Sequence, residues 1–178
     1  MRISLLMKAK PPFHRLNWQK PSTYKHPMDS TLWALLLNPK SMTTYLKRRC
    51  SAFRVECVAQ TRQIQRIPFH GKRRFVINRE VILFDGQTPL MIAQTWLPHA
   101  ALTGAARRLR EMDDKPLGPY LFNTLGLVRH GFQVARWEET PQTIHWCRRS
   151  EFVGLPQPVV LHECFLPSLF ELRQKSET

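Results

Sequence analysis

The chain has 178 residues, of which 43% are hydrophobic, which suffices for one domain with its own core. No run approaches the ~20 apolar residues that a membrane-spanning helix needs, which argues against an integral helical membrane protein. The formal charge of +14 is compatible with a nucleic acid, an anionic membrane surface or an anionic substrate as the partner.

Residues 1–28 combine prolines with scattered basic residues and have no apolar period, so we expect an arm that lies on the domain or stays mobile. Residues 29–178 form the predicted domain. The apolar run at the N-terminus is too short for a signal peptide, and we expect a cytoplasmic protein. The four cysteines form no CxxC pair and have no histidine at metal-binding spacing, so we expect reduced thiols and no metal site.

Two short helices are predicted at the start of the domain. Residues 29–30 can cap a helix over 31–37, and Ser41 can cap a second helix over 42–49. The basic residues of the second helix fall in its last turn, as the helix dipole favours.

From residue 53 the pattern alternates, which predicts a strand over 53–64. A second strand is expected over 75–84. It is followed by Asp85-Gly86-Gln87-Thr88, a hairpin-turn sequence, and by a partner strand over 89–97.

Residues 99–112 return to helical spacing and predict a helix. The two prolines and the glycine of 115–119 are expected to prevent its continuation. Three further strands, over 125–138, 143–153 and 158–166, fit the remainder. The predicted fold is α+β: a single six-stranded, mostly antiparallel sheet with helices before it and one helix inserted in its middle.

Arg79 is the first candidate functional residue, because alternation places it on one strand face among Phe75, Ile77, Val81 and Leu83. A guanidinium is costly there unless it is paired, and it cannot lose its proton. Three interpretations follow: an edge strand that lets Arg79 reach solvent, a buried carboxylate partner, or a ligand carboxylate that matches the fork of the guanidinium.

Glu163 is the second candidate, because it lies between Leu161 and Phe165 on an apolar face of the last predicted strand. Two explanations stay open. One is a structural ion pair between Arg79 and Glu163, which often gains little net stability. The other is a pocket in which Arg79 binds a substrate carboxylate and Glu163 accepts a hydrogen bond from a substrate hydroxyl.

Five motifs, in order and at matching spacing over about residues 30 to 170, resemble the chorismate pyruvate-lyase family. They are Ser41-Met42-Thr43, Arg79-Glu80 followed by an Asp-Gly hairpin, Thr95-Trp96-Leu97-Pro98, Lys115-Pro116-Leu117-Gly118-Pro119-Tyr120-Leu121-Phe122, and Glu163-Cys164-Phe165-Leu166-Pro167. The most specific is the Pro-Leu-Gly-x-Tyr-Leu-Phe turn.

The resemblance implies one antiparallel sheet of six strands with helical flaps over an internal ligand site. It also implies an activity, the elimination of pyruvate from chorismate to give 4-hydroxybenzoate, the first step toward the ubiquinone head group. This lyase reaction uses no metal or organic cofactor. The expected partner is then the small molecule chorismate and not a nucleic acid, and we expect a monomer.

The resemblance also implies roles for individual residues. Arg79 holds the carboxylate of the aromatic product, and Glu163 meets the ring hydroxyl; these are the expected catalytic residues. Backbone groups of Met42 and Leu117 line the pocket. Gln94 stands in the strand after the hairpin, where the family often has an arginine, and is expected to donate a hydrogen bond to the substrate in place of a second fixed charge.

The loops 39–43 and 113–120 both contain proline and are suited to act as lids over such a site. The alternative function is a non-catalytic module of the same fold that binds a small aromatic acid, because fold does not fix function. The sequence has no helix-turn-helix segment and keeps both Arg79 and Glu163, which favours the enzyme. A nucleic-acid-binding protein would rest on the charge alone.

Overall fold

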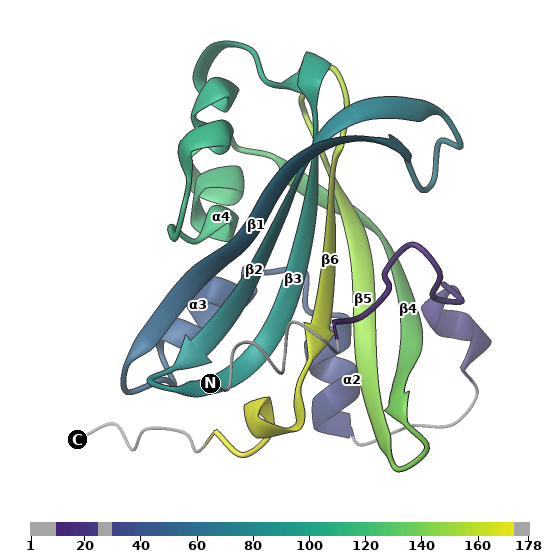
Figure 1. Cartoon of the computed structure of the whole chain (residues 1–178), viewed down its shortest axis with the longest axis vertical. Helices are drawn as coiled ribbons and strands as arrows, with labels where there is room; N and C mark the ends of the chain where they lie inside the picture. Colours follow the sequence, from purple (N-terminus) through teal and green to yellow (C-terminus); the bar gives the residue numbers. More distant parts are fainter. Residues whose placement is uncertain (1–9, 25–29, 173–178) are drawn as a thin grey trace.

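The computed structural model describes residues 10–24 and 30–172. Within these ranges the chain forms one six-stranded sheet, in the order β1-β2-β3-β6-β5-β4, with every neighbouring pair antiparallel (Figure 1). The strands are β1 (Phe53–Arg66), β2 (Arg73–Asp85), β3 (Thr88–Pro98), β4 (Val128–Thr140), β5 (Thr143–Val153) and β6 (Val159–Phe165). The predicted α+β fold with a single antiparallel sheet is confirmed.

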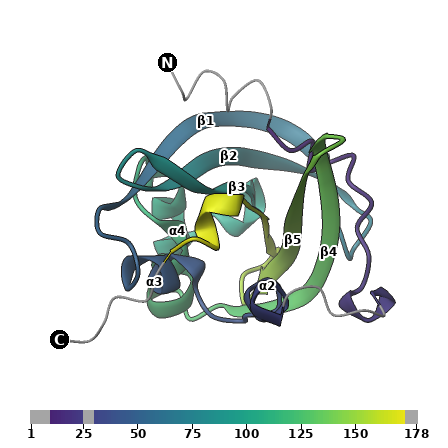
Figure 2. The ribbon, with the colours of Figure 1, turned by 90° about the horizontal axis from the view of Figure 1, so that it is seen from below.

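The sheet is strongly curved and encloses its own core, as the view along the strands shows (Figure 2). The short helices α2 (Ser30–Leu36) and α3 (Met42–Lys47) lie on its concave side. The main hydrophobic cluster fills the space between them and the inner face of the sheet. Alternation therefore matters at every central strand, because one residue in two points into this enclosed space.

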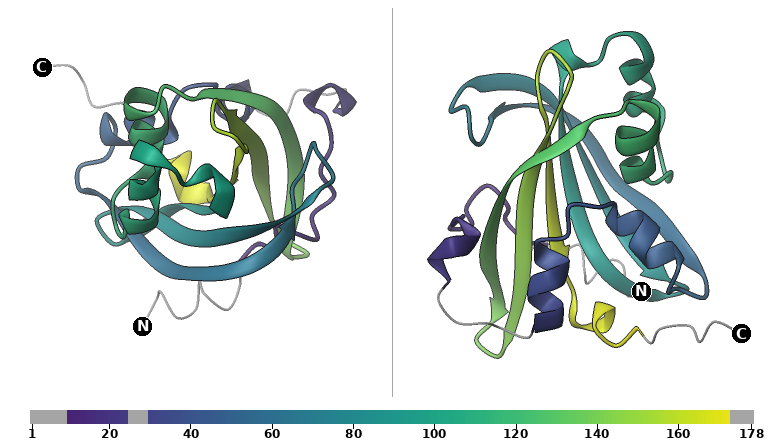
Figure 3. Two further views of the ribbon diagram at one scale, coloured as in Figure 1. Left: turned by 90° about the horizontal axis from the view of Figure 1, so that it is seen from above. Right: turned by 180° about the vertical axis from the view of Figure 1, so that it is seen from behind.

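Local sequence explains the two flaps. Ser41 caps α3 as predicted, and its Oγ accepts a hydrogen bond from the Thr44 amide at 3.3 Å. The expected cap residue Asp29 lies outside the described residues. The second flap is a helical segment made of α4 (Leu117–Pro119) and the π-helical turn η4 (Tyr120–Thr124), seen from above in Figure 3.

One sequence prediction in this region is wrong. The helix expected over 99–112 is instead two 3₁₀ helices, η2 (His99–Ala101) and η3 (Gly104–Glu111), and Gly104, the first residue of η3, has a φ of +53°, which interrupts a continuous right-handed helix. Helical structure does stop after Glu111, as the prolines and the glycine of 115–119 were expected to ensure, and a new short helix, α4, begins at Leu117. Pro116 precedes the first helical residue, and Pro119 falls in the first turn, where its missing N–H has no intrahelical acceptor to lose.

The N-terminal arm lies on the outer, convex face of the sheet over the residues that the structure describes. Phe13 is buried there, in a cluster with Ile82 and Phe84 of β2, and Trp18 packs against the same cluster. Gln19 forms a pair of 2.9 Å backbone hydrogen bonds with Val134 of β4. The arm continues into η1 (Pro21–Thr23), and η5 (Pro167–Leu169) follows the last strand. Both faces of the central strands are thus covered.

Among the described helices, none combines the length and apolarity needed to cross a membrane.

Candidate active site

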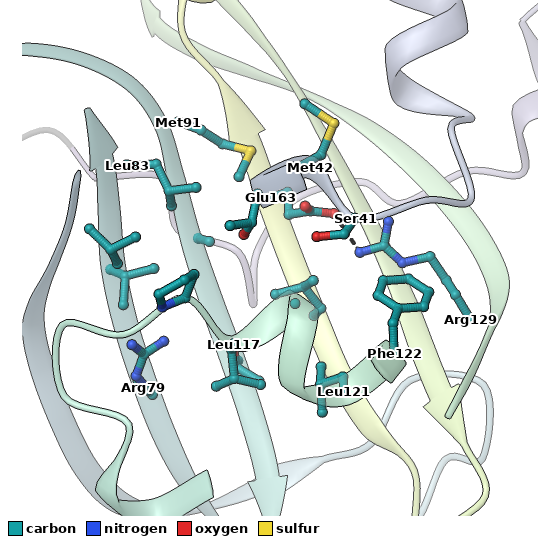
Figure 4. A pocket seen from close by; sticks show the side chains of 18 residues that line it. Ser41, Met42, Arg79, Leu83, Met91, Leu117, Leu121, Phe122, Arg129 and Glu163 are labelled. Atoms are coloured by element: carbon teal, nitrogen blue, oxygen red, sulfur yellow. Dashed lines mark hydrogen bonds and ion pairs between the residues drawn. The ribbon is translucent and has the colours of Figure 1, made fainter. Parts of the chain in front are cut away.

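A cavity lies between the inner face of the sheet and the two flaps, and it contains about 490 Å³ of space outside the protein atoms, part of it open to solvent (Figure 4). Its walls are mainly apolar, and three charged side chains enter it. The lining residues are Ser41, Met42, Thr43, Val55, Arg79, Val81, Leu83, Met91, Ala93, Thr95, Pro116, Leu117, Gly118, Leu121, Phe122, Arg129, Leu161 and Glu163. An enclosed apolar site with a few convergent charges is typical of a small-molecule site.

The flaps touch each other over this cavity. A Cβ atom placed on Gly118 would lie 2.7 Å from the Oγ of Ser41, closer than real Cβ contacts come. Only glycine therefore allows the second flap to approach the cap residue of α3 this closely. The structure has the closed arrangement that the two proline-containing loops were expected to adopt over a site.

Arg79 reaches the cavity from the middle of β2 and is 1% exposed. Its Nη2 donates hydrogen bonds to the backbone oxygens of Asp113, at 2.5 Å, and Lys115, at 2.8 Å. Among the described residues no carboxylate forms an ion pair with it, and its Nε has no hydrogen-bond partner. The guanidinium is therefore oriented by the second flap, and no carboxylate of the described residues lies within ion-pair distance of it.

Burial lowers the pKa of Arg79 from its usual value. The Cys57 thiol and the carboxylates of Asp114 and Asp113 act in the opposite direction, since they favour the cation. Two interpretations of Arg79 are wrong: it does not reach solvent past an edge strand, and it does not form an ion pair with Glu163. The ligand-carboxylate interpretation stays a prediction.

Glu163 enters the cavity from β6 and is 2% exposed. Its Oε2 accepts a hydrogen bond from Arg148 Nε at 2.6 Å and forms an ion pair with Arg129 Nη2 at 3.3 Å. Burial alone would raise its pKa, but the two arginines outweigh burial and hold the pKa below the usual range. Glu163 is therefore a carboxylate anion at neutral pH.

Arg148 lies behind Glu163 on β5, directly opposite it in the strand register, and is completely buried. Its Nη1 donates to three backbone oxygens at the end of α2 and the start of the first flap: Leu35 at 2.8 Å, Asn38 at 2.9 Å and Leu36 at 3.2 Å. It does not line the cavity. Arg148 therefore fixes the orientation of Glu163 and joins the first flap to the sheet.

Arg129 of β4 is the charged wall residue that sequence reasoning missed. Its side chain is 2% exposed, and its guanidinium lies over the rings of Phe152, Phe122 and Phe132, at 4.9, 5.6 and 5.8 Å. Burial lowers its pKa to about 10, so it stays a cation at neutral pH, and its Nε has no partner in the described chain. No local pattern marks it, because its burial depends on residues from other strands and from a flap.

The buried charges at the cavity do not cancel. Arg79 and Arg129 enter the cavity as cations and Glu163 as an anion, and the buried Arg148 behind Glu163 brings the buried excess to two positive units, which the exposed carboxylates of Asp113 and Asp114 near Arg79 offset in part. A buried excess of this kind is costly in an empty apolar site. It matches a ligand with two negative charges.

Gln94 does not reach the cavity. It lies on the outer face of β3, where its Nε2 donates a hydrogen bond to Glu80 Oε1 at 3.2 Å. The side chain therefore points away from the cavity and does not form the expected hydrogen bond to a ligand there. The cause is a bulge: β2 pairs with β3 with a register shift between Leu83 and Phe84, and Leu90 has no partner in the ladder. An uninterrupted hairpin would place Gln94 opposite Arg79, and one extra residue moves it to the other face.

The remaining predicted residues do meet. Met42 and Leu117, each the first residue of a short flap helix, line the same cavity as Arg79 and Glu163 (Figure 4). Arg79 and Glu163 come from strands separated by β3 and face inward at different levels of the sheet. The cavity thus has a cation at one end and a carboxylate between two arginines at the other.

The chain was compared with known families and proteins. A family model described as chorismate lyase matches residues 13–175. A probable chorismate pyruvate-lyase of Nitrosomonas eutropha is 32% identical over 93% of this chain and all of its own length. Another, of Vibrio vulnificus, is 31% identical over 93% of this chain and 90% of its own, and the chorismate pyruvate-lyase of Proteus mirabilis is 29% identical over 86% and 90%.

Among solved structures, a possible transcriptional regulator of Bacillus subtilis superposes with a TM-score of 0.48 and 11% identity, over 99% of this chain and 97% of its own. A GntR-family transcriptional regulator of Bacillus cereus superposes with a TM-score of 0.46 and 16% identity, over 70% of this chain and 99% of its own.

Proposed function

The chain belongs to the chorismate lyase family, and from this we propose that it eliminates pyruvate from chorismate to give 4-hydroxybenzoate, the precursor of the ubiquinone head group. The observation that carries the proposal for this chain is the buried Arg79, which has no ion-pair partner among the described residues, in the same cavity as the Arg129–Glu163 pair.

The reaction breaks the ether bond at ring carbon 3, removes the hydrogen of carbon 4 as a proton, and returns a proton to the departing enolpyruvate, which becomes pyruvate. The ring becomes aromatic, so the overall change is downhill. The protein has to hold a dianion in one orientation and to stabilise charge as the C–O bond breaks. The two-unit positive excess at the cavity suits a substrate with two carboxylates.

Arg79 is the proposed receptor of the ring carboxylate. Its hydrogen bonds to the Asp113 and Lys115 carbonyls orient the guanidinium before a ligand enters, so little side-chain freedom is lost on binding. A planar fork also selects a carboxylate over a single point charge.

Glu163 and Arg129 are proposed to act at the other end of the ring. Ionised Glu163 is suited to accept a hydrogen bond from the ring hydroxyl and to stabilise positive charge that develops on the ring carbons beside it. Arg129, 3.3 Å away, is suited to bind the enolpyruvyl carboxylate and to stabilise negative charge on the departing oxygen.

The flaps supply the remaining functions. The first amides of α3 and α4, at Met42 and Leu117, have no acceptor within their own helices and are available to a bound carboxylate or carbonyl. Contact between Gly118 and Ser41 limits the entry of water. We also propose a monomeric enzyme, which analytical ultracentrifugation of the purified protein would test.

The test is to incubate the purified protein with chorismate and to follow both products, 4-hydroxybenzoate by chromatography and pyruvate by reduction with lactate dehydrogenase. We expect the two products in equal amounts, with Arg79→Ala prepared in the same way as the inactive control. A protein that binds 4-hydroxybenzoate but releases neither product from chorismate would be the non-catalytic binding module instead.

A further inference from the structure

The far end of the β1–β2 hairpin extends beyond the rest of the sheet. β2 pairs with β3 only from Val76 onward, whereas its pairing with β1 continues to Arg66 and Arg73. The end of β1 and the beginning of β2 therefore form a two-stranded ribbon. The loop 67–72 closes this ribbon, which projects from the body of the protein (Figures 1 and 3).

One face of this ribbon carries exposed apolar side chains. Ile64 and Phe75 are cross-strand partners, so their side chains lie next to each other, and they are 57% and 49% exposed. The ring of Phe75 has an edge-on contact, at 6.2 Å between centroids, with His99, which is itself exposed. These are two of the most exposed large apolar side chains in the described residues, and they are adjacent.

Arginines surround this pair on the same face. Alternation and register place Arg62, Arg66 and Arg73 on the side of Ile64 and Phe75, and all three are exposed. We refer to these five residues as the ribbon face. No carboxylate forms an ion pair with any of its arginines in the part of the chain that the structure describes.

The charge around the ribbon face is uniformly positive along the chain. Residues 61–79 contain six lysine and arginine residues and no aspartate or glutamate. The three ribbon arginines do not line the catalytic cavity, so the proposed reaction does not need them. The ribbon face therefore presents apolar side chains and unneutralised arginines together, outside the site that the proposed function uses.

We propose that the ribbon face docks on an anionic lipid surface, with Phe75 and Ile64 at the boundary between headgroups and acyl chains and the three arginines on lipid phosphates. At a bilayer interface, burial of apolar side chains and attraction of cations to anionic lipids both strengthen binding. Arginine can keep its charged end among the headgroups while its aliphatic part lies deeper. A single-stranded nucleic acid would instead need stacking platforms, and Ile64, the more exposed of the two apolar residues, offers no ring.

The experiment uses the full chain and co-sedimentation with two kinds of vesicle, phosphatidylglycerol mixed with phosphatidylcholine, and phosphatidylcholine alone. We expect binding to the mixed vesicles only, and weaker binding as salt is added. Each arginine near an anionic surface is worth about fivefold in affinity, so the triple variant R62Q/R66Q/R73Q should bind on the order of 100-fold more weakly.

Two matched controls separate the ribbon face from net charge and from general apolarity. R48Q/R107Q/R108Q removes the same charge from exposed arginines elsewhere, and it should lose far less affinity than the ribbon triple variant. I64S/F75S should weaken binding at least about tenfold, whereas I144S/F170S, an equivalent pair that is 40% exposed at both positions, should not.

Equal losses in the ribbon and control variants would overturn the proposal, because the binding would then come from diffuse charge. No binding to the mixed vesicles, together with retention of a single-stranded RNA that the ribbon variants abolish, would overturn it in favour of a nucleic-acid surface. None of the substituted residues lines the cavity, so lyase turnover in solution should be unchanged in every variant, and its loss would concern the proposed function and not this surface.

Discussion

The two faces of the central strands carry polar residues at neighbouring positions but use them differently. Arg79 and Glu163 point into the cavity, and their chain neighbours Glu80 and His162 point to the outer face. On that face Glu80, Gln94 and His162 stand in one row across β2, β3 and β6. Glu80 and His162 are buried like the inner pair, and Gln94 is half-buried, so burial alone does not distinguish the two faces.

The single charge of the outer row, that of Glu80, is compensated by the chain itself, whereas the neutral ring of His162 has no hydrogen-bond partner for either nitrogen among the described residues. Glu80 accepts hydrogen bonds from Lys10 at 2.7 Å, Asn78 at 3.0 Å and Gln94 at 3.2 Å. Burial acts to raise the pKa of Glu80, and these three partners together lower it below its usual value. His162 is enclosed by aromatic rings, the nearest being Trp96 at 4.5 Å, and burial together with the nearby Arg149 lowers its pKa to about 3, so it is neutral.

The charges of the inner set are not fully compensated. Arg79 has backbone carbonyls but no carboxylate within ion-pair distance in the described part of the chain, and the buried side chains around the cavity carry more positive than negative charge. Burial of a charged group therefore does not by itself indicate the functional face. A buried charge that the protein does not compensate does indicate it. Each prediction below tests one side of this difference.

The largest effect is expected for Arg79→Ala. Loss of the proposed carboxylate receptor should lower kcat/KM for chorismate by about 10²–10³-fold, in the range seen when one donor to a reacting charge is removed. Arg79→Lys should recover little, because a point charge does not reproduce the fork. The matched outer-face variant Glu80→Gln should keep near-normal kinetics; if it lost as much activity as Arg79→Ala, the two faces would not differ in function.

Glu163→Gln should be the most destabilising of these variants. It leaves Arg148 buried without a counter-ion, and breaking a buried pair in this way costs roughly 3–5 kcal/mol in the free energy of unfolding. Urea denaturation at pH 7 measures this directly. The same substitution at Glu80 should cost much less, since Lys10 can turn to solvent. Full stability of Glu163→Gln would contradict the ion-pair geometry.

The pH dependence of Glu163 follows from its lowered pKa. A carboxylate whose pKa is lower in the folded state stabilises the protein above its unfolded value, near ~4.3, and this contribution is lost as pH falls through the folded pKa. The stability difference between the wild type and Glu163→Gln should therefore shrink below about pH 4. A stability difference that stays constant down to pH 3 would show that Arg129 and Arg148 do not stabilise an ionised Glu163.

On the outer face, His162 should make the protein sensitive to mild acid. Its folded pKa of about 3 lies below the unfolded value of 6.5, so only the unfolded state binds the proton between these values and stability falls as pH is lowered. Between pH 6.5 and 5 the loss should be about 1.5 kcal/mol, and His162→Gln should lack it. Catalysis at saturating chorismate should not follow this titration. An unchanged slope in the variant would assign the acid sensitivity to other groups.

The smallest effect is expected for Gln94→Arg, which adds a positive charge to the outer face of β3. On the outer face the new guanidinium would pair with Glu80, and a partly exposed pair is worth about 0–1 kcal/mol. The Kd for chorismate should change less than about twofold. A tenfold gain in affinity would show that position 94 reaches the cavity and would remove the distinction between the faces.

The sequence predicted most of the sheet, because the alternation over 53–64 and 75–84 has a period of two, which a helix does not have. The same alternation correctly put Arg79 and Glu163 on inner faces. It did not predict the position of Gln94, since the unpaired Leu90 reverses the faces of the rest of β3 and no residue type marks a bulge there.

The partners of Glu163 were beyond sequence reasoning for a different reason. Arg148 meets it through the register of β5 on β6, and the irregular connection between these strands leaves that register unspecified by sequence. Arg129 is buried only because a flap and neighbouring strands supply phenylalanine rings around it. The wrong prediction of a helix over 99–112 shows that apolar spacing does not distinguish an α-helix from a 3₁₀ helix, because a 3₁₀ helix can also bury one side.

The most direct test of the central claim is whether Arg79 binds a carboxylate, measured by calorimetry with 4-hydroxybenzoate and with 4-hydroxybenzyl alcohol, which lacks the charge. Each compound is titrated into the wild type and into Arg79→Ala. We predict that the wild type prefers the acid by at least about tenfold, the value of one charged hydrogen bond, and that Arg79→Ala loses this preference while it binds the alcohol as before. A preference for the acid that survives intact in Arg79→Ala would contradict the account.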